Sequence, residues 1–416
     1  MSEHWHRGEG HRALLQARAH ELVAFFQYSA PDPAGGFHAL DLDGEPVPTP
    51  VRDLVGQSRL TYSFALAHLM GRPGALELAE AGVDWLLDRH RDPGHGGYRW
   101  EVAADERDGP GDETKRAYGH AFVLLAAAAG VLAGARRAEE LFDDVAAVLE
   151  ERFWDPAQGR YREDFTRDWQ PLEAYRGQNS NMHLVEALLT AHDAIGAPPF
   201  LDRASSVAER LIDDEARRHG WRVQEHHDEC WRPVPEYNRD RPFDVYRPYG
   251  TRPGHSWEWA RLLVQLHTAL PDLSRLLPAA RELYAQAFAD GWWPGREHPA
   301  YTVDAVGRPV VDDVVWWPVT EAIGAAAALA EATGDPAFSE DYVRLWAYAD
   351  RWFVDHRRGG WYAVRTPGGE VSEHPWPGKP DLYHTLAAHL IPLFPTATSV
   401  AGGLMALDSS TSRRSS

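Results

Sequence analysis

The chain contains almost no cysteine. Cys230 is its one cysteine in 416 residues, so no disulfide can form within the chain. This excludes the small disulfide-stapled domains of exported proteins. Residues 1–11 also lack the apolar stretch of a secretory signal peptide, and the longest apolar run, residues 121–135, is too short to span a bilayer. We therefore expect a cytoplasmic protein with no membrane partner.

Positive charge is scarce as well. The chain has 42 Lys and Arg against 62 Asp and Glu, a formal net charge of −20. Nucleic acids and anionic membranes normally bind basic patches, so the balance argues against both and favours a neutral or cationic small molecule. Tryptophan, by contrast, is abundant, with 17 residues. Such side chains fill a large core and also cover the faces of sugar rings.

A glycine-aromatic pattern recurs six times along the chain. Successive copies lie roughly 60 to 70 residues apart, a spacing that suits one helix pair and its connection in a repeat protein. Each copy predicts a short hairpin between two helices. The six copies begin at Gly35, Gly96, Gly159, Gly220, Gly291 and Gly359.

Between these copies, apolar residues follow a helical period and predict two helices per repeat. The first helices of the pairs are expected near 9–28, 75–91, 137–153, 199–215, 274–289 and 336–355. The second helices are expected near 52–70, 112–132, 179–195, 254–269, 313–332 and 380–393. Six pairs without a long strand predict an all-α fold, an (α/α)6 barrel with short β-hairpins in the connections at one end.

The second helix of each pair is apolar on more of its surface and should form the inner ring. We expect residues 1–395 to form a single barrel domain and residues 396–416 to be a disordered tail. The long insert 226–250, rich in Pro, Arg, Asp and Tyr, is expected to fold over one end of the barrel as a lid.

Polar residues gather where the inner helices begin. The run from Tyr175 to His183 is rich in amides, and we expect Asn179 or Ser180 to cap the helix there. Asn179 and His183 are four residues apart and so share one helical face. Similar polar starts recur at 252–258, 315–321 and 379–384, and we interpret them as walls of one site.

Three of these helix starts carry a histidine, His183, His255 and His384. Histidine both accepts and donates protons near neutral pH, so these three are the acid–base candidates. Glu258 lies one turn after His255 and is predicted to orient that imidazole or to bind a hydroxyl.

Other polar residues of the helix starts suit the binding of a sugar. Trp317 and Glu321 combine an aromatic face with a hydrogen-bond acceptor, as sugar sites do. Arg59 is a candidate to hold a carbonyl or enediolate oxygen.

Four motifs resemble the N-acylglucosamine 2-epimerase superfamily, and in particular its branch of aldose–ketose isomerases. They lie at 176–183, 253–259, 316–321 and 379–384, in the family's order. The resemblance implies an (α/α)6 barrel, a monosaccharide substrate, no cofactor and no metal. It also implies two catalytic histidines, His255 and His384. The substrate-contacting residues that it implies are Arg59, Tyr118, Asn179, His183, Glu258, Trp317 and Glu321.

Such an isomerase would interconvert an aldose and its ketose, with D-mannose and D-fructose the leading pair and D-lyxose and D-xylulose a second one. The sequence leaves open which histidine moves which proton, and whether the outcome is isomerisation or 2-epimerisation. It also leaves three other classes: an (α/α)6 glycoside hydrolase using Glu258 and Glu321, a non-catalytic sugar-binding protein, and a metal enzyme. The metal enzyme would use His183, His255, His384 and Glu258. Oligomeric state is not predicted.

Overall fold

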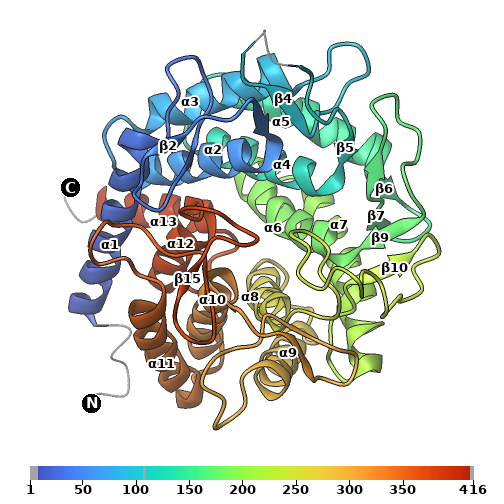
Figure 1. The fold of residues 1–416 in the computed structure, drawn as a ribbon, viewed down its shortest axis with the longest axis vertical. Helices are drawn as coiled ribbons and strands as arrows, with labels where there is room; N and C mark the ends of the chain where they lie inside the picture. Colours follow the sequence, from blue (N-terminus) through green and yellow to red (C-terminus); the bar gives the residue numbers. More distant parts are fainter. Residues whose placement is uncertain (1–7, 106–108, 413–416) are drawn as a thin grey trace.

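The computed structural model describes residues 8–105 and 109–412, and it arranges twelve helices in two concentric rings (Figure 1). The outer ring consists of α1 (Glu9–Ser29), α3 (Ala75–Trp85), α5 (Ala138–Val148), α7 (Pro198–Ala208), α9 (Leu276–Gly291) and α11 (Pro336–Trp352). The inner ring consists of α2 (Leu54–Leu69), α4 (Ala117–Leu132), α6 (Gln178–Ile195), α8 (Pro253–Ala269), α10 (Trp316–Thr333) and α12 (Leu382–Leu390). The predicted (α/α)6 barrel is confirmed, and each predicted helix is present within a few residues of its expected bounds.

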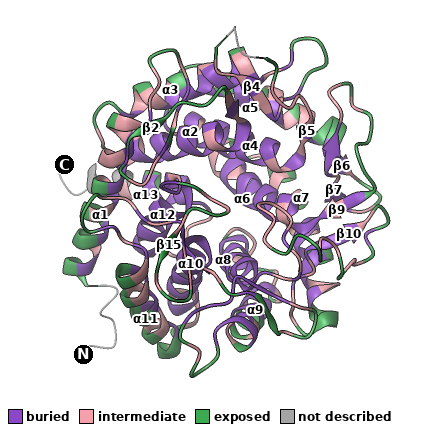
Figure 2. Ribbon diagram, in the orientation of Figure 1, coloured by how far each residue is buried: buried purple, intermediate pink, exposed green. Residues whose placement is uncertain are grey.

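The two rings differ because their sequences differ. In α4, the run 121–129 is built of Ala, Phe, Val and Leu and is buried on every side. An outer helix such as α5 buries one stripe, which includes Leu141, Phe142 and Val145, and turns its acidic residues to solvent. Burial accordingly increases from the rim to the inner ring (Figure 2). Small alanine side chains allow the inner helices to approach closely.

Several outer helices end in a short turn of another helical type. Three continue as π-helical turns, and 3₁₀ turns follow at two further places in the chain. These turns are η2 (Leu86–His90), η3 (Leu149–Phe153), η4 (Glu209–Asp213), η5 (Ala216–His219) and η6 (Ile391–Leu393).

Short strands link neighbouring repeats in a closed cycle at one end of the barrel. The segment before each inner helix pairs antiparallel with a segment of the next repeat, and the last such segment, at Lys379, pairs with Leu40 of the first repeat. The six pairings are β3 (Val51–Asp53) with β4 (Glu101–Ala103), β5 (Lys115–Arg116) with β8 (Asp164–Phe165), β9 (Tyr175–Gly177) with β10 (His226–Asp228), Thr251 with Val303, β13 (Val314–Val315) with β14 (Val364–Arg365), and Lys379 with Leu40. The cycle fixes where all six inner helices begin.

The remaining strands form local pairs. They are β1 (Ala39–Leu40) with β2 (Pro46–Val47), β6 (Trp154–Asp155) with β7 (Arg160–Tyr161), β11 (Thr302–Val303) with β12 (Pro309–Val311), and β15 (Val371–Ser372), which extends β14. Four of the six glycine-aromatic copies form the predicted hairpin, with pairings at Phe37, Tyr98, Tyr161 and Trp361. The copies at Gly220 and Gly291 have no such pairing among the described residues, because a 3₁₀ turn precedes the first and α9 runs directly into the second.

The C-terminal segment contradicts its expected disorder. Helix α13 (Val400–Ser412) packs against α2 and α6, and Val400, Ala401 and Leu404 are buried. These three residues share one helical face, a spacing too short for the sequence pattern to reveal as a core element. Ser399 anchors the start of the helix by donating its Oγ hydrogen bond to Asp193 at the end of α6 (2.6 Å). Residues 413–416 lie outside the described residues.

Within the described residues, no helix is both long and apolar enough to cross a membrane.

Candidate active site

A cavity of about 450 Å³ opens where the six inner helices begin. Its lining includes a residue predicted for the site from every inner helix. These are Arg59 from α2, Tyr118 from α4, Asn179 and His183 from α6, His255 and Glu258 from α8, Trp317 from α10 and His384 from α12. Eight of the nine predicted residues therefore meet in one cavity. The ninth, Glu321, lies behind His384 and is not part of the lining.

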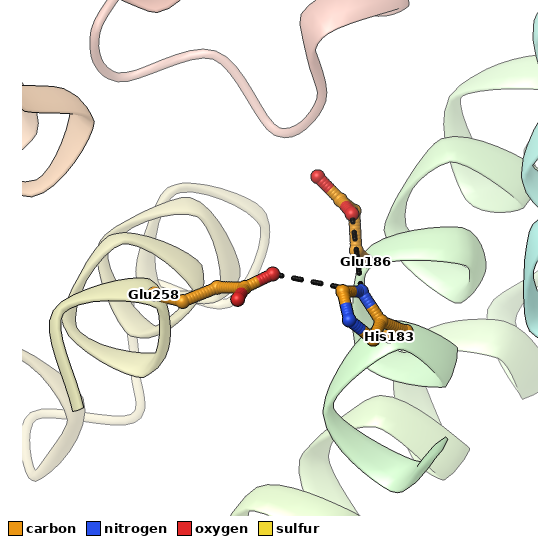
Figure 3. A group of neighbouring side chains, drawn as sticks. All are labelled: His183, Glu186 and Glu258. Carbon is orange, nitrogen blue, oxygen red and sulfur yellow. Dashed lines mark ion pairs between the residues drawn. The ribbon is translucent and has the colours of Figure 1, made fainter. Parts of the chain in front are cut away.

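His255 is held by a carboxylate that the sequence did not indicate. Nδ1 of His255 lies 2.9 Å from Oε1 of Glu225, the residue just before β10. Glu225 also accepts hydrogen bonds from the side chains of Arg252 and Gln178, each at 2.9 Å. Because Nδ1–H is directed at Glu225, Nε2 of His255 is left as a lone-pair base. The expected partner Glu258 does not fill this role, since its side chain points to the α6 side of the cavity (Figure 3).

The Glu225 carboxylate is fully buried and yet ionised. Burial alone would raise its pKa, but Arg252 and His255 outweigh burial and hold that pKa well below the usual range. Burial, together with the charge of Arg252, lowers the pKa of His255 to about 4 despite its glutamate partner. The imidazole is therefore neutral at pH 7, the form that accepts a proton.

Gln178 holds the Glu225 carboxylate in place beside His255. Trp259 donates its indole N–H to Oε1 of Gln178 (2.8 Å), so the amide nitrogen must face Glu225. Gln178 is also the first residue of α6, where the sequence predicted a cap at Asn179 or Ser180. Neither residue caps the helix. The Ser180 hydroxyl donates instead to buried Glu163 (2.7 Å), and Oδ1 of Asn179 has no partner among the described residues, which leaves it free for a ligand.

His384 is also held through Nδ1 by a buried glutamate, as His255 is. Its Nδ1 lies 2.8 Å from Oε1 of Glu321, and the other oxygen of Glu321 accepts from Nε of Arg261 at 3.0 Å. Burial would raise the pKa of Glu321, but Arg261 and His384 lower it. Glu321 thus orients His384 as Glu225 orients His255, and Nε2 of both rings remains for the cavity.

One tryptophan contacts both histidines. The Trp317 ring centroid lies 5.1 Å from that of His255 and 5.8 Å from that of His384, and the second pair is stacked at 29°. The contact fixes both imidazole planes against one rigid surface.

Arg59 is held in place from several sides. Its guanidinium donates to Asp381 and to the Tyr118 hydroxyl, both at 3.1 Å. It also lies 4.3 Å from the centre of the Phe122 ring and 4.7 Å from that of Tyr383. A guanidinium fixed in this way is pre-organised to stabilise negative charge on a ligand oxygen.

Glu258 and His183 face each other across the cavity floor, beside Glu186 (Figure 3). Nδ1 of His183 lies 3.5 Å from Glu258 and 3.9 Å from Glu186. Neither carboxylate oxygen of Glu258 has a hydrogen-bond partner among the described residues, although the residue is fully buried. Burial, together with the neighbouring charge of Glu321, raises the pKa of Glu258 well above its usual range. This shift favours the protonated carboxyl, which can donate a hydrogen bond to a ligand oxygen.

Arg261 compensates the negative charge of the glutamates beneath the cavity floor. Its guanidinium lies 3.0 Å from Glu321, 3.2 Å from Glu186 and 3.7 Å from Glu258. One cation among three carboxylates favours a proton on one of them, and Glu258 is the one whose oxygens have no hydrogen-bond partner among the described residues. Neither Arg261 nor Glu186 was predicted, because both lie inside helices whose sequence pattern marks them as core positions.

A metal site made of the three predicted histidines is not formed. Among the described residues, the side chains close enough to share an ion are His183, Glu186 and Glu258, and they include neither His255 nor His384. The Arg261 guanidinium lies 3.2 Å from Glu186 and 3.7 Å from Glu258 and so already compensates the charge of these carboxylates. The residues present thus fit a metal poorly.

The insert 226–250 contributes to the cavity as expected of a lid. Val245 and Tyr246 line it, and Arg247 fixes the segment through an ion pair with Asp164 (2.8 Å) and by stacking on Tyr175 (3.9 Å). The start of the same insert is strand β10, directly after Glu225.

The chain is similar to known proteins over nearly its whole length. The family model for N-acylglucosamine 2-epimerase matches residues 35–388. A D-mannose isomerase of Thermobifida fusca is 44% identical over 96% of this chain and 98% of its own length, and one of Pseudomonas cannabina pv. alisalensis is 40% identical over 97% and 98%. A crystal structure of a D-mannose isomerase superimposes with a TM-score of 0.86 at 31% identity, covering 92% of this chain and 97% of the other. A cellobiose 2-epimerase from Spirochaeta thermophila has a TM-score of 0.80 at 23% identity over 96% of this chain and 97% of its own, which shows the shared fold.

Proposed function

The chain belongs to the N-acylglucosamine 2-epimerase family, and from this premise we propose that it is an aldose–ketose isomerase that interconverts D-mannose and D-fructose. The observation that carries the proposal is the pair of imidazoles, each held through Nδ1 by a buried carboxylate and lining one cavity. D-lyxose and D-xylulose are the second pair to test.

The reaction needs two proton movements, and the site offers one histidine for each. In the open-chain aldose, Nε2 of His384 takes the proton from C2, the C2 electrons form the C1=C2 double bond of the cis-enediol, and the electrons of the C1 carbonyl bond move to O1, which at first carries the negative charge. His384 then returns its proton to C1. His255 carries the proton from O2 to O1, so that O2 becomes the ketose carbonyl and all atoms balance. The exchange of these two roles between the histidines is the alternative to test.

Other side chains stabilise the charge and hold the sugar. Arg59 faces the developing enediolate oxygen, where its fixed donors lower the barrier. Neutral Glu258, Asn179 and His183 bind the remaining hydroxyls, and Trp317 covers the ring carbons. In this proposal Glu321 acts through His384 and does not contact the sugar.

Two alternatives remain beside the isomerase, and this geometry makes the first of them weaker. A glycoside hydrolase would need Glu258 and Glu321 as facing carboxyls, but Glu321 is bonded to His384 and Arg261 and lies outside the lining. A 2-epimerase would return the proton to C2 from the opposite face of the intermediate.

Product analysis in D₂O separates isomerase from epimerase. Mannose incubated with the enzyme should give fructose that carries some protium moved from C2 to C1, because one base serves both carbons. Early formation of glucose labelled at C2 would instead identify a 2-epimerase. A protein that binds mannose without turnover would be a sugar-binding protein.

We also propose that catalysis needs no metal and takes place in the cytoplasm. Arg59 and Arg261 supply the positive charge that a metal would otherwise bring. Activity should survive exhaustive chelation, and a loss restored by a divalent ion would contradict the metal-free reaction. Cell fractionation tests the location.

A further inference from the structure

Buried cations in this protein are paired with carboxylates, with one exception. Seven Lys and Arg residues are buried in the described part of the chain. Six of them have a carboxylate oxygen at 3.1 Å or closer: Arg52, Arg59, Lys115, Arg252, Arg261 and Lys379. The seventh, Arg160, has no ion pair and no side-chain hydrogen bond with any described residue. A buried charge without a partner destabilises a fold, so we expect Arg160 to bind a negatively charged group.

Arg160 lies in β7, away from the sugar cavity. It is 8% exposed, and its Nε is buried without a partner. Its guanidinium stacks on the Trp231 ring, 4.0 Å from the ring centre. The stack orients the guanidinium plane but brings no negative charge. Burial, together with the nearby charge of Arg210, lowers the pKa of Arg160 to about 10, which leaves it charged at pH 7.

The neighbouring carboxylates are already in use. Asp214 accepts from Arg210 at 3.0 Å and lies 3.6 Å from Arg218. Glu215 lies 2.7 Å from Nε2 of His227. Asp155 accepts from Arg162 at 3.3 Å and from the backbone N–H of Ala157 at 3.1 Å. None of them comes within ion-pair distance of Arg160.

Arg160 borders a separate cavity of about 310 Å³. Arg210 and Arg218 stand at the same cavity with exposed side chains, and Gln158 adds a side-chain amide. Three guanidinium groups face two carboxylates there, which leaves a net positive charge. Guanidinium forks match the paired oxygens of a phosphate or phosphate monoester.

We propose that this cavity is a second ligand site, which binds a phosphate group, either free or as a phosphate monoester, on Arg160. Trp231 stands on the hairpin that begins with β10, directly after Glu225, so the bound anion also ties this hairpin to β7. The site thereby stabilises the segment that supplies the carboxylate partner of His255.

Titration calorimetry with inorganic phosphate, and separately with glucose 6-phosphate, tests the site at low ionic strength. The variants are Arg160→Met, which keeps much of the side-chain length but removes the charge, and Arg203→Met as a matched control. Arg203 also stacks on a tryptophan, Trp154, at 4.4 Å, but it is already paired with Glu150 at 2.7 Å. We expect Arg160→Met to weaken binding on the order of tenfold or more, the scale of a lost charge-assisted contact, and Arg203→Met to bind as the wild type does.

The binding results support or overturn the phosphate site as follows. Binding of glucose 6-phosphate alone would restrict the ligand to monoesters, and binding of both anions would identify the phosphate group itself as the ligand. Equal binding by wild type and Arg160→Met, or no binding of either anion to the wild type, would overturn the proposal. Melting temperatures report whether the variants are folded. If Arg160→Met does not fold, Arg160→Lys keeps the charge without the fork and should still bind phosphate more weakly than the wild type.

Discussion

Glu225 lies 2.9 Å from Nδ1 of His255, although the two residues are 30 positions apart in the chain. Glu258, one turn after His255 in the same helix, makes no hydrogen bond to it. The pKa of Glu258, the neighbour in sequence, is raised and that of the distant Glu225 is lowered, which favours a protonated Glu258 and an ionised Glu225. This difference in charge state separates the two glutamates experimentally.

Replacement of either histidine should nearly abolish turnover. His255→Asn and His384→Asn should each lower kcat by on the order of 10²-fold or more, because each removes one of the two proposed acid–base groups. Steady-state rates with mannose measure the effect, and melting temperatures confirm that the variants fold. Near-normal turnover in a folded variant would exclude that histidine from the chemistry.

The glutamates should respond differently to the same change. Glu225→Gln removes an ionised partner and should lower kcat on the order of 10²-fold, because the imidazole loses its oriented tautomer. Glu258→Gln replaces a neutral acid with a neutral amide of similar shape and should be milder. Comparison of kcat and KM for the two variants checks this, and a larger loss in Glu258→Gln would contradict the assigned charge states.

Acid should destabilise the fold at pH values well above those at which carboxylates usually titrate. Burial lowers the pKa of six histidines to about 3 or 4, against roughly 6.5 in an unfolded chain. Below about pH 6.5 these histidines are therefore protonated in the unfolded chain but still neutral in the folded protein. The free energy of unfolding falls with pH until the histidines of the folded protein are protonated as well. The six are His90, His120, His183, His226, His255 and His389.

Carboxyls whose pKa is raised act in the opposite sense. Burial raises the pKa of Asp53, Asp164, Asp193 and Asp313, and two further carboxyls are shifted most. Burial raises the pKa of Glu163 to about 7 and that of Glu258 well above its usual range. As the pH falls, both are therefore protonated in the folded protein before they are protonated in the unfolded chain. The six histidines outnumber the two carboxyls whose pKa is shifted most, so the melting temperature should fall from pH 6.5 to pH 4.5. His90, which lies away from the cavity, offers the control, since His90→Gln should reduce the slope. A melting temperature constant over that range would contradict the prediction.

Sugar phosphates should be poor substrates. Each Lys or Arg that lines the cavity is already paired with a carboxylate: Arg52 with Asp32, Arg59 with Asp381, Arg252 with Glu225 and Lys379 with Asp355. A phosphate would be desolvated there without a free cation, so kcat/KM for mannose 6-phosphate should be lower than for mannose on the order of 10²-fold or more. Comparable values for the two sugars would show that one of these pairs opens.

The sequence predicted what depends on periodicity and on local motifs. Apolar spacing located the twelve barrel helices, and the helix starts identified eight residues that line the cavity. Glu225 was missed because it precedes a strand in a segment without periodicity, and its role arises from strand pairing between β9 and β10. Arg261 was missed because a charge within a buried helix face gives no local signal. Glu321 was found as a site residue, but its position behind His384 depends on side-chain packing.

The cycle of strand pairings also bears on how the protein is made. The pairing of Lys379 with Leu40 joins the last repeat to the first, and His384 follows only a few residues later. A nascent chain that has not yet reached this point has an open ring, lacks one of the two histidines proposed for the chemistry and exposes the apolar faces of its inner helices. Sugar binding and burial of the inner ring should therefore arise together, late in translation, and truncated chains ending before Lys379 should depend on chaperones to stay in solution.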